Sequence, residues 1–224
     1  MIHDDFDGLG KSFSGVCIVG AGPVGITLAV ELERLKIPVL LLESGGHRQS
    51  DSIQALAEAD FATPDRHDDM SVATARALGG TSNLWGARCV IYDPVDFVPR
   101  PGLVNANWPI AYDDIFPHYA RACQIADAGD VVYSAPIPGV TCADDSFSFD
   151  TLERWANEQK LHVTHRKLLA RSPLIDVRLR CVVTDIGISP DGRVRDVEIV
   201  RADGGERRRL GVDRLVIAAG GLES

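Results

Sequence analysis

The segment from Val16 to Gly45 constrains the fold more than any other part of the chain, because its residue types follow the order strand, glycine-rich turn, helix, strand. The apolar run from Val16 to Val19 predicts a strand that is buried on both faces. It leads directly into Gly20, Gly22 and Gly25 at G-x-G-x-x-G spacing. In such a turn the first glycine allows the tight bend, the second lets a phosphate approach the backbone, and the third lets the helix pack on the strand. The pattern predicts an α/β fold with a parallel sheet.

The residues after these glycines predict a helix of about 14 residues, long enough to run back beside a strand. Pro23 falls in its first turn, where the missing N–H costs no hydrogen bond. We expect four apolar residues at helical spacing to face the sheet: Val24, Leu28, Leu32 and Leu35. Pro38 ends the helix, and the apolar residues Val39 to Leu42 predict the next strand.

Glu43 stands at the end of that second strand, about 20 residues beyond the glycines, where a carboxylate accepts hydrogen bonds from the two ribose hydroxyls of a dinucleotide. Ser44 beside it joins the candidate site. The pyrophosphate would lie on the free N–H groups of the helix that starts near Gly22. Because an acid at this position repels a 2′-phosphate, the sequence favours FAD or NAD over NADP.

A second glycine-rich stretch reads ARALGGTSNLWGARC and follows a polar segment, residues 46 to 75, that we expect to be a surface excursion. Gly79 and Gly80 offer flexible backbone, and Thr81, Ser82 and Asn83 offer small hydrogen-bonding side chains. This combination suits a loop that lies along a phosphate or the edge of a flavin. Taken alone, it is equally consistent with a turn before a strand.

The C-terminal third predicts three strands in a meander, at residues Val177 to Ile188, Val194 to Arg201 and Arg207 to Val212. Proline, aspartate and glycine clusters between them are strong turn signals. A further apolar run, Arg214 to Ala219, ends in two glycines and predicts a parallel strand that rejoins the first sheet. Upstream, we expect a helix over Thr151 to Lys160.

Charge and cysteine usage narrow the possible partners and the compartment. The formal net charge of −9 argues against nucleic acid or an anionic membrane as a partner. Five cysteines lack C-x-x-C spacing, which favours reduced thiols in a cytoplasm: Cys17, Cys89, Cys123, Cys142 and Cys181. We expect Cys17 and Cys181 in the core. No apolar run reaches the roughly 18 residues of a membrane span, so we expect a cytoplasmic protein.

Several segments together resemble the N-terminal portion of the glucose–methanol–choline family of oxidoreductases: the first βαβ unit, LGGTSNLWGARC, DPVDF through NWPIAYDDIFPHYARA, and RLVIAAGGLES. The resemblance implies a Rossmann-like FAD-binding domain, with a parallel sheet, helices and a three-stranded β-meander, and part of a second, substrate-binding or cap domain. On this basis we divide the chain into residues 1–128, 129–172 and 173–224. It also implies FAD as cofactor and oxidation of a CH–OH group in an alcohol, sugar or polyol by hydride transfer to the flavin.

The resemblance also implies roles for individual residues. The first three glycines would take the pyrophosphate, Gly79 to Ser82 the region between pyrophosphate and flavin, and the backbone of Val183 the adenine edge. Leu84 stands where some relatives attach FAD covalently through histidine, so binding is expected to be noncovalent. Trp85 would line the flavin side or belong to the core. The full candidate set is Gly20, Gly22, Pro23, Gly25, Glu43, Ser44, Gly79, Gly80, Thr81, Ser82, Asn83, Trp85, Val183, Ala219 and Gly220.

No residue is nominated as catalytic or as a metal ligand. In the family the base is a histidine far downstream, so we expect it beyond Ser224, and we expect partners to be a small alcohol or sugar and either a C-terminal half or an electron-acceptor protein. Two alternatives stay open at this stage. The first is an NAD-dependent dehydrogenase, and the second is a noncatalytic nucleotide-binding fragment that needs a separate C-terminal half.

Overall fold

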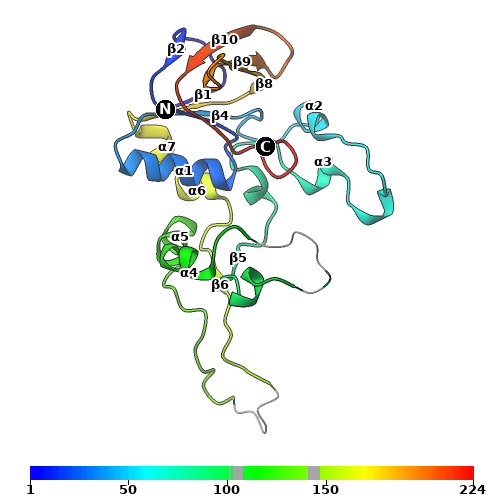
Figure 1. Ribbon diagram of the computed structural model, residues 1–224, viewed down its shortest axis with the longest axis vertical. Helices are drawn as coiled ribbons and strands as arrows, with labels where there is room; N and C mark the ends of the chain where they lie inside the picture. Colours follow the sequence, from blue (N-terminus) through cyan, green and yellow to red (C-terminus); the bar gives the residue numbers. More distant parts are fainter. Residues whose placement is uncertain (101, 103–107, 141–146) are drawn as a thin grey trace. The chain divides into compact units, whose positions relative to one another are not determined.

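The computed structural model describes residues 1–100, 102, 108–140 and 147–224 of the chain (Figure 1). These residues form two compact units, one made of residues 1–85 and 160–224 and the other of residues 86–159. The sequence-based division lies at residues 128 and 172 instead, because it followed motif order rather than contacts. The assignment of a substrate domain stays a prediction. Cys142 and the start of the NWPIAYDD stretch lie outside the described residues.

A five-stranded, all-parallel sheet forms the centre of the first unit. Its strands, in spatial order, are β1 (Ile2–His3), β7 (Ile175–Arg178), β4 (Val39–Leu42), β3 (Val16–Val19) and β11 (Leu215–Ile217). Both strands of the predicted βαβ unit have the expected bounds, and the last apolar run pairs in parallel with β3 as expected. The predicted α/β fold class is confirmed.

The sheet is covered on both faces, so its central strands are almost wholly apolar. Cys17, Leu40 and Leu42 pack into a cluster with buried residues of the meander on one face. The other face carries Ile18, which approaches the helix α1 (Pro23–Arg34) at Gly25. Figure 1 shows α1, α6 (Leu161–Thr164) and α7 (Arg166–Arg171) on the side of the sheet opposite the meander.

The predicted apolar face of α1 is wrong, because the face that the helix buries is rotated from it by about one residue. The residues that α1 buries are Gly25, Ile26, Ala29 and Val30, whereas Val24 and Leu35 of the predicted stripe are 67% and 57% exposed. The reason is the third glycine: the helix approaches β3 most closely at Gly25, which has no side chain, so the flanking residues of that face are buried with it.

The meander is an antiparallel sheet of β8 (Cys181–Ile188), β9 (Val194–Arg201) and β10 (Arg207–Val212), extended by a short parallel strand β2 (Ser12–Phe13). The bounds of β9 and β10 agree with the prediction. The single strand expected over Val177–Ile188 is wrong, because the chain changes sheets within it. Arg180 adopts a left-handed φ of 56° and separates β7, in the parallel sheet, from β8.

The N-terminal segment joins the two sheets, which the sequence did not indicate. Phe6 is fully buried within the cluster that fills the space between them. The guanidinium of Arg178 donates to the carbonyl of Asp7 at 2.7 Å. From the meander, Arg208 donates to the carbonyls of Phe6 and Leu9 at 3.2 and 3.0 Å. Two arginines therefore hold the loop backbone that connects β1 with β2.

Residues 46 to 75 form the expected excursion, with α2 (Asp51–Gln54), α3 (Met70–Ala73) and two short 3₁₀ turns, Ala55–Ala57 and Pro64–Arg66. It is not wholly a surface feature, because Ile53, Gln54 and Met70 are buried. The Gln54 amide donates to the Thr74 carbonyl at 2.9 Å and its oxygen accepts the Arg76 N–H at 3.0 Å. These bonds fix the start of the second glycine-rich stretch.

The second unit contains α4 (Tyr112–Ile115), α5 (Tyr119–Ala126), the 3₁₀ turns Pro94–Phe97 and Phe116–His118, and a two-stranded ladder of β5 (Arg88–Cys89) with β6 (Arg154–Trp155). The helix expected over Thr151–Lys160 is wrong. Its backbone bonds leave the segment instead: the N–H groups of Leu152, Ala156 and Asn157 reach the carbonyls of Tyr133, Ala87 and Asp127.

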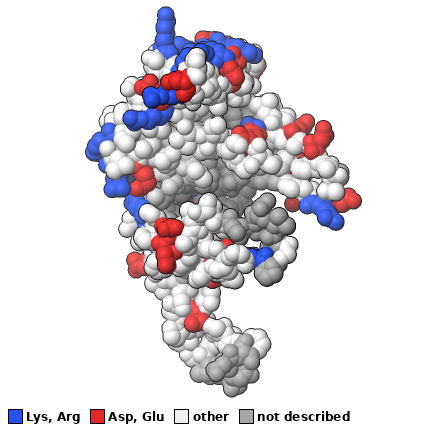
Figure 2. Space-filling view, viewed as in Figure 1, with Lys and Arg blue, Asp and Glu red and all other residues white. Residues whose placement is uncertain are grey.

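Charged side chains on the exposed face of the meander are paired rather than gathered by sign. Arg209 lies between Asp185 and Asp196, and Arg207 donates to Glu198 at 3.0 Å. Figure 2 shows the resulting mixture of basic and acidic side chains over this sheet. Within the described ranges, none of the helices is both long and apolar enough to cross a bilayer.

Candidate functional site

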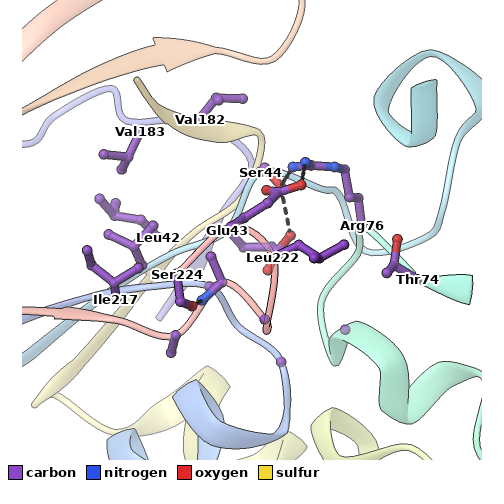
Figure 3. A pocket seen from close by; sticks show the side chains of 18 of the residues that line it. Leu42, Glu43, Ser44, Thr74, Arg76, Val182, Val183, Ile217, Leu222 and Ser224 are labelled. Atoms are coloured by element: carbon purple, nitrogen blue, oxygen red, sulfur yellow. Dashed lines mark hydrogen bonds and ion pairs between the residues drawn. The ribbon is translucent and has the colours of Figure 1, made fainter. Parts of the chain in front are cut away.

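A cavity of about 1020 Å³ opens in the first unit where β3, β4 and β11 end, with β8 as a further wall. This is the carboxyl edge of the parallel sheet, which is where open α/β sheets bind ligands. Figure 3 shows Val182 and Val183 of β8 toward one end of the lining and Arg76 and Thr74 toward the other, with Glu43 and Ser44 between them. The cavity brings together both glycine-rich stretches and the predicted acid.

The first glycine turn is shaped by close backbone contacts. Gly20 has a φ of 101°, and a Cβ there would lie 2.3 Å from the carbonyl oxygen of Ala218. A Cβ at Gly25 would lie 1.9 Å from the carbonyl oxygen of Gly20. Both positions therefore require glycine for the protein's own packing.

Gly22 differs from its two neighbours in the motif. Its φ of −80° suits any residue, and a Cβ there would meet nothing closer than the Cα of Gly80 at 3.8 Å. The described residues thus leave room at Gly22, which lines the cavity at the start of α1. The protein's own packing does not require glycine at position 22. Close approach of a phosphate to the start of the helix would require it.

Glu43 is buried, with only 5% of its surface exposed, and its carboxylate faces the glycine turn. The N–H groups of Ala21 and Gly45 each donate to it at 2.8 Å, and the Ser44 hydroxyl donates to Oε1 at 3.3 Å. Burial raises the pKa of the Glu43 carboxyl, while these hydrogen bonds and the charge of Arg76 lower it. The predicted acid therefore lies beside the helix start.

The second glycine-rich stretch packs directly on the first. Gly79 and Gly80 have φ values of 99° and 51°, and a Cβ at Gly80 would lie 2.7 Å from the Cα of Gly22. A 3₁₀ turn, Gly80–Asn83, follows. Ser82 donates to the Gly79 carbonyl at 2.6 Å and Asn83 to that of Gly80 at 2.8 Å. These two side chains fold the loop, and its backbone forms the cavity wall.

Ten of the fifteen predicted cofactor-binding residues line this cavity. They are Gly20, Gly22, Pro23, Glu43, Ser44, Gly80, Thr81, Val183, Ala219 and Gly220. The other five, Gly25, Gly79, Ser82, Asn83 and Trp85, are not among the lining residues. Gly25, Ser82 and Asn83 shape the walls from behind, as their contacts above show, and contact of the set with a cofactor stays a prediction.

Sequence reasoning missed Arg76, which lies in the cavity wall three residues before Gly79. Its guanidinium donates to the Ser44 hydroxyl at 3.2 Å and to the Leu56 carbonyl at 3.1 Å, and it forms an ion pair with Glu223. Its side chain is 14% exposed. The available signal was a cation just before the two glycines of an otherwise apolar and small-residue segment.

No histidine is among the described residues that line this cavity. Among the described residues, no group of three or more histidine, cysteine or acidic side chains is placed to hold a metal ion. His162 packs beside the second glycine stretch, since a Cβ at Gly79 would lie 2.4 Å from its Nδ1. It is half-buried.

No family model matches the chain, whereas comparison with known proteins finds a curated oxidase and solved oxidoreductase structures that resemble it. The 6'''-hydroxyparomomycin C oxidase of Streptomyces lividus is 29% identical over 115 residues, which is 46% of this chain and 21% of that protein. Pyridoxine 4-oxidase from Mesorbium loti superposes with a TM-score of 0.56 at 18% identity, over 94% of this chain and 50% of that one. An FAD-dependent oxidoreductase from Chaetomium thermophilum gives a TM-score of 0.60 at 16% identity, over 93% and 46%.

These likenesses confirm the resemblance to glucose–methanol–choline oxidoreductases that the motifs indicated. The chain has the fold of FAD-dependent oxidoreductases, with a parallel sheet between helices and a meander. It spans about half the length of the two solved structures, and its matched segment covers about a fifth of the curated relative.

Proposed function

We propose that this chain is the FAD-binding part of a flavin-dependent oxidoreductase that oxidises a CH–OH group of an alcohol, sugar or polyol. The observation that carries the proposal is the cavity in which two glycine stretches meet at Gly22 and Gly80 beside the buried carboxylate of Glu43. A helix start with room for a phosphate, next to an acid for ribose hydroxyls, fits the AMP half of FAD.

Each part of the wall has a role in this proposal. The N–H groups at the start of α1 would hold the pyrophosphate, and Glu43 would accept hydrogen bonds from the ribose. Val183 of β8 would border the adenine, and the Gly80–Thr81 backbone the portion of the cofactor nearer the flavin. Leu84 stands where a covalent histidine link would be made, which favours noncovalent FAD.

Bound FAD would supply the hydride acceptor for oxidation of the alcohol carbon. The residues of this chain hold and orient that cofactor, and we nominate none of them as the catalytic base. The base and most of the substrate pocket are proposed to lie in sequence that the longer relatives have and this chain does not span. A cytoplasmic location and an electron acceptor, either oxygen or a carrier protein, complete the proposal.

Titration of the purified 224-residue chain with FAD and, separately, with NAD tests this function. We expect the chain to bind FAD and show a visible flavin spectrum. A charge-assisted hydrogen bond contributes about 1.5–3 kcal/mol, so Glu43→Ala should weaken FAD binding by roughly ten- to a hundredfold.

The matched control is Glu58→Ala, because Glu58 is an exposed acid on the excursion and does not line the cavity. It should bind FAD as the unaltered chain does. Tight binding of NAD without binding of FAD would replace the proposal by a nicotinamide-dependent one. A folded chain that binds neither would overturn it.

A further inference from the structure

Four side chains form a continuous relay along one side of the cavity: Glu223, Arg76, Ser44 and Glu43. Arg76 forms the ion pair with Glu223, and its Nη1 donates to the Ser44 hydroxyl at 3.2 Å. Ser44 in turn donates to Oε1 of Glu43 at 3.3 Å. The Arg76 guanidinium donates to the Ser44 hydroxyl, and that hydroxyl donates to the Glu43 carboxylate. Both hydrogen bonds therefore point from Arg76 toward Glu43. Figure 3 shows Ser44 and Arg76 turned toward each other beside Glu43.

The guanidinium of Arg76 is fixed in place by segments that are far apart in the sequence. Glu223 follows β11, Ser44 follows β4, and the Leu56 carbonyl belongs to the excursion. The backbone N–H of Arg76 is also held, by the Gln54 side chain at 3.0 Å. A cation anchored from three directions and 14% exposed keeps its position relative to Glu43.

The other charged and titratable groups near Glu43 have different partners or are neutral. On β7, Arg178 is paired with Asp176 at 2.8 Å and reaches the N-terminal segment. On β8, burial raises the pKa of the Cys181 thiol to about 12, so it is uncharged at neutral pH. Asp185 of β8 is paired with Arg209.

Arg180 is a further cation in this part of the chain. Its guanidinium lies beside Gly46, since a Cβ there would be 3.5 Å from its Nε. The turn before α1 presents only backbone N–H groups to Glu43. Burial raises the pKa of the Glu43 carboxyl, and the positive charge of Arg76 is among the effects that lower it.

Resting on the FAD site proposed above, we propose that Arg76 is a positioning residue that acts through Ser44 to keep Glu43 a carboxylate turned toward the ribose. Together with the hydrogen bonds from Gly45, Ala21 and Ser44, Arg76 would thereby lower the pH at which Glu43 is protonated and the cofactor is lost. A protonated Glu43 would offer one acceptor fewer to the ribose hydroxyls. Because burial raises the pKa of Glu43 and Arg76 opposes that effect, loss of Arg76 moves the protonation of Glu43 to higher pH.

The test is the pH dependence of the FAD dissociation constant of the whole chain, measured by flavin fluorescence, with ADP as a second probe. In the unaltered chain, affinity should fall as the pH is lowered. Arg76→Met and Ser44→Ala should move this fall to higher pH, and Arg76→Lys should restore part of the difference. Arg66→Met, which removes an exposed arginine of the excursion outside the cavity, should leave the profile unchanged.

The decisive comparison is Arg76→Met made in a chain that also carries Glu43→Gln, because glutamine does not titrate. In Glu43→Gln, affinity should lose most of its pH dependence, and adding Arg76→Met should change the remaining profile little. Ser44→Ala keeps the proposal testable if Arg76→Met does not fold, since it removes one oxygen and leaves the other anchors of Arg76 in place.

Two outcomes would overturn the proposed role of Arg76. The first is that Ser44→Ala and folded Arg76→Met have the pH profile of the unaltered chain, and the second is that Arg76→Met shifts the profile equally with and without Glu43→Gln. Either result would leave the FAD site standing. Failure of the unaltered, folded chain to bind FAD or ADP would instead overturn the proposed function itself.

Discussion

Of two alanine substitutions three residues apart, Gly25→Ala should mainly lower stability, whereas Gly22→Ala should mainly weaken cofactor binding. At Gly25 the new Cβ would lie 1.9 Å from the Gly20 carbonyl oxygen, a backbone atom that no side-chain rotation can move away. The helix α1 must therefore move off β3, which loosens the packing of Ile26 and Ala29. At Gly22 the new Cβ would have its nearest protein neighbour at 3.8 Å.

The expected size of the stability change follows from two opposing contributions. Overpacking a core contact costs about 1–3 kcal/mol, and a rigid backbone clash belongs at the upper end. Alanine in a helix gains about 1 kcal/mol over glycine. Gly25→Ala should therefore lower the free energy of unfolding by about 2 kcal/mol or more. Gly22→Ala replaces a tolerated N-cap residue and should cost less than about 1 kcal/mol.

Urea unfolding followed by circular dichroism measures the first effect, and FAD titration measures the second. Gly22→Ala should fold almost as stably as the unaltered chain yet bind FAD more weakly, because its methyl group occupies the approach of the phosphate. Gly86→Ala, at a position with nothing within 4 Å, is the control and should be close to neutral in both assays. The reasoning is refuted if Gly25→Ala is as stable as the parent, or if Gly22→Ala binds FAD as tightly as Gly86→Ala.

Three further predictions concern the scaffold of the first unit. Phe6→Ala should lower the free energy of unfolding by about 3–5 kcal/mol in urea titrations, because the ring is fully buried between the two sheets, and a change below 1 kcal/mol would contradict that role. Burial raises the pKa of the thiols of Cys17 and Cys181 to about 12, so neither should react with a disulfide reagent at pH 8 until urea unfolds the chain, as mass spectrometry of labelled peptides can check. Hydrogen bonds from Arg195 and Arg209 lower the pKa of Asp196, so the stability from this pairing is present above the ordinary aspartate pKa and disappears as the pH falls through the lowered value. Arg209→Met should therefore be less stable than the parent at pH 7 and should approach it in acid, and a constant difference across pH would argue against the pairing.

Local pattern was sufficient for the parts of the fold that neighbouring residues decide. The order of strand, glycines, helix, strand and acid from Val16 to Glu43 appears in the structure as expected, and β9 and β10 have the predicted bounds. Apolar periodicity, turn residues and glycine spacing act within about 10 residues, so they are visible in a sequence. Four of the predicted residues that line the cavity, Gly20, Gly22, Pro23 and Glu43, belong to the first of these segments.

The tertiary structure alone decided the features that depend on contact between distant segments. Close approach at Gly25 selected which face of α1 is buried, and the change of sheet at Arg180 divided a continuous apolar run into two strands. Arg76 and Glu223 are 147 residues apart, so no local pattern could show that they pair beside Glu43. The sequence by itself determined where the cofactor-binding elements are. Only long-range packing decided how they meet, because partners for a buried charge or a helix face are chosen in space and not along the chain.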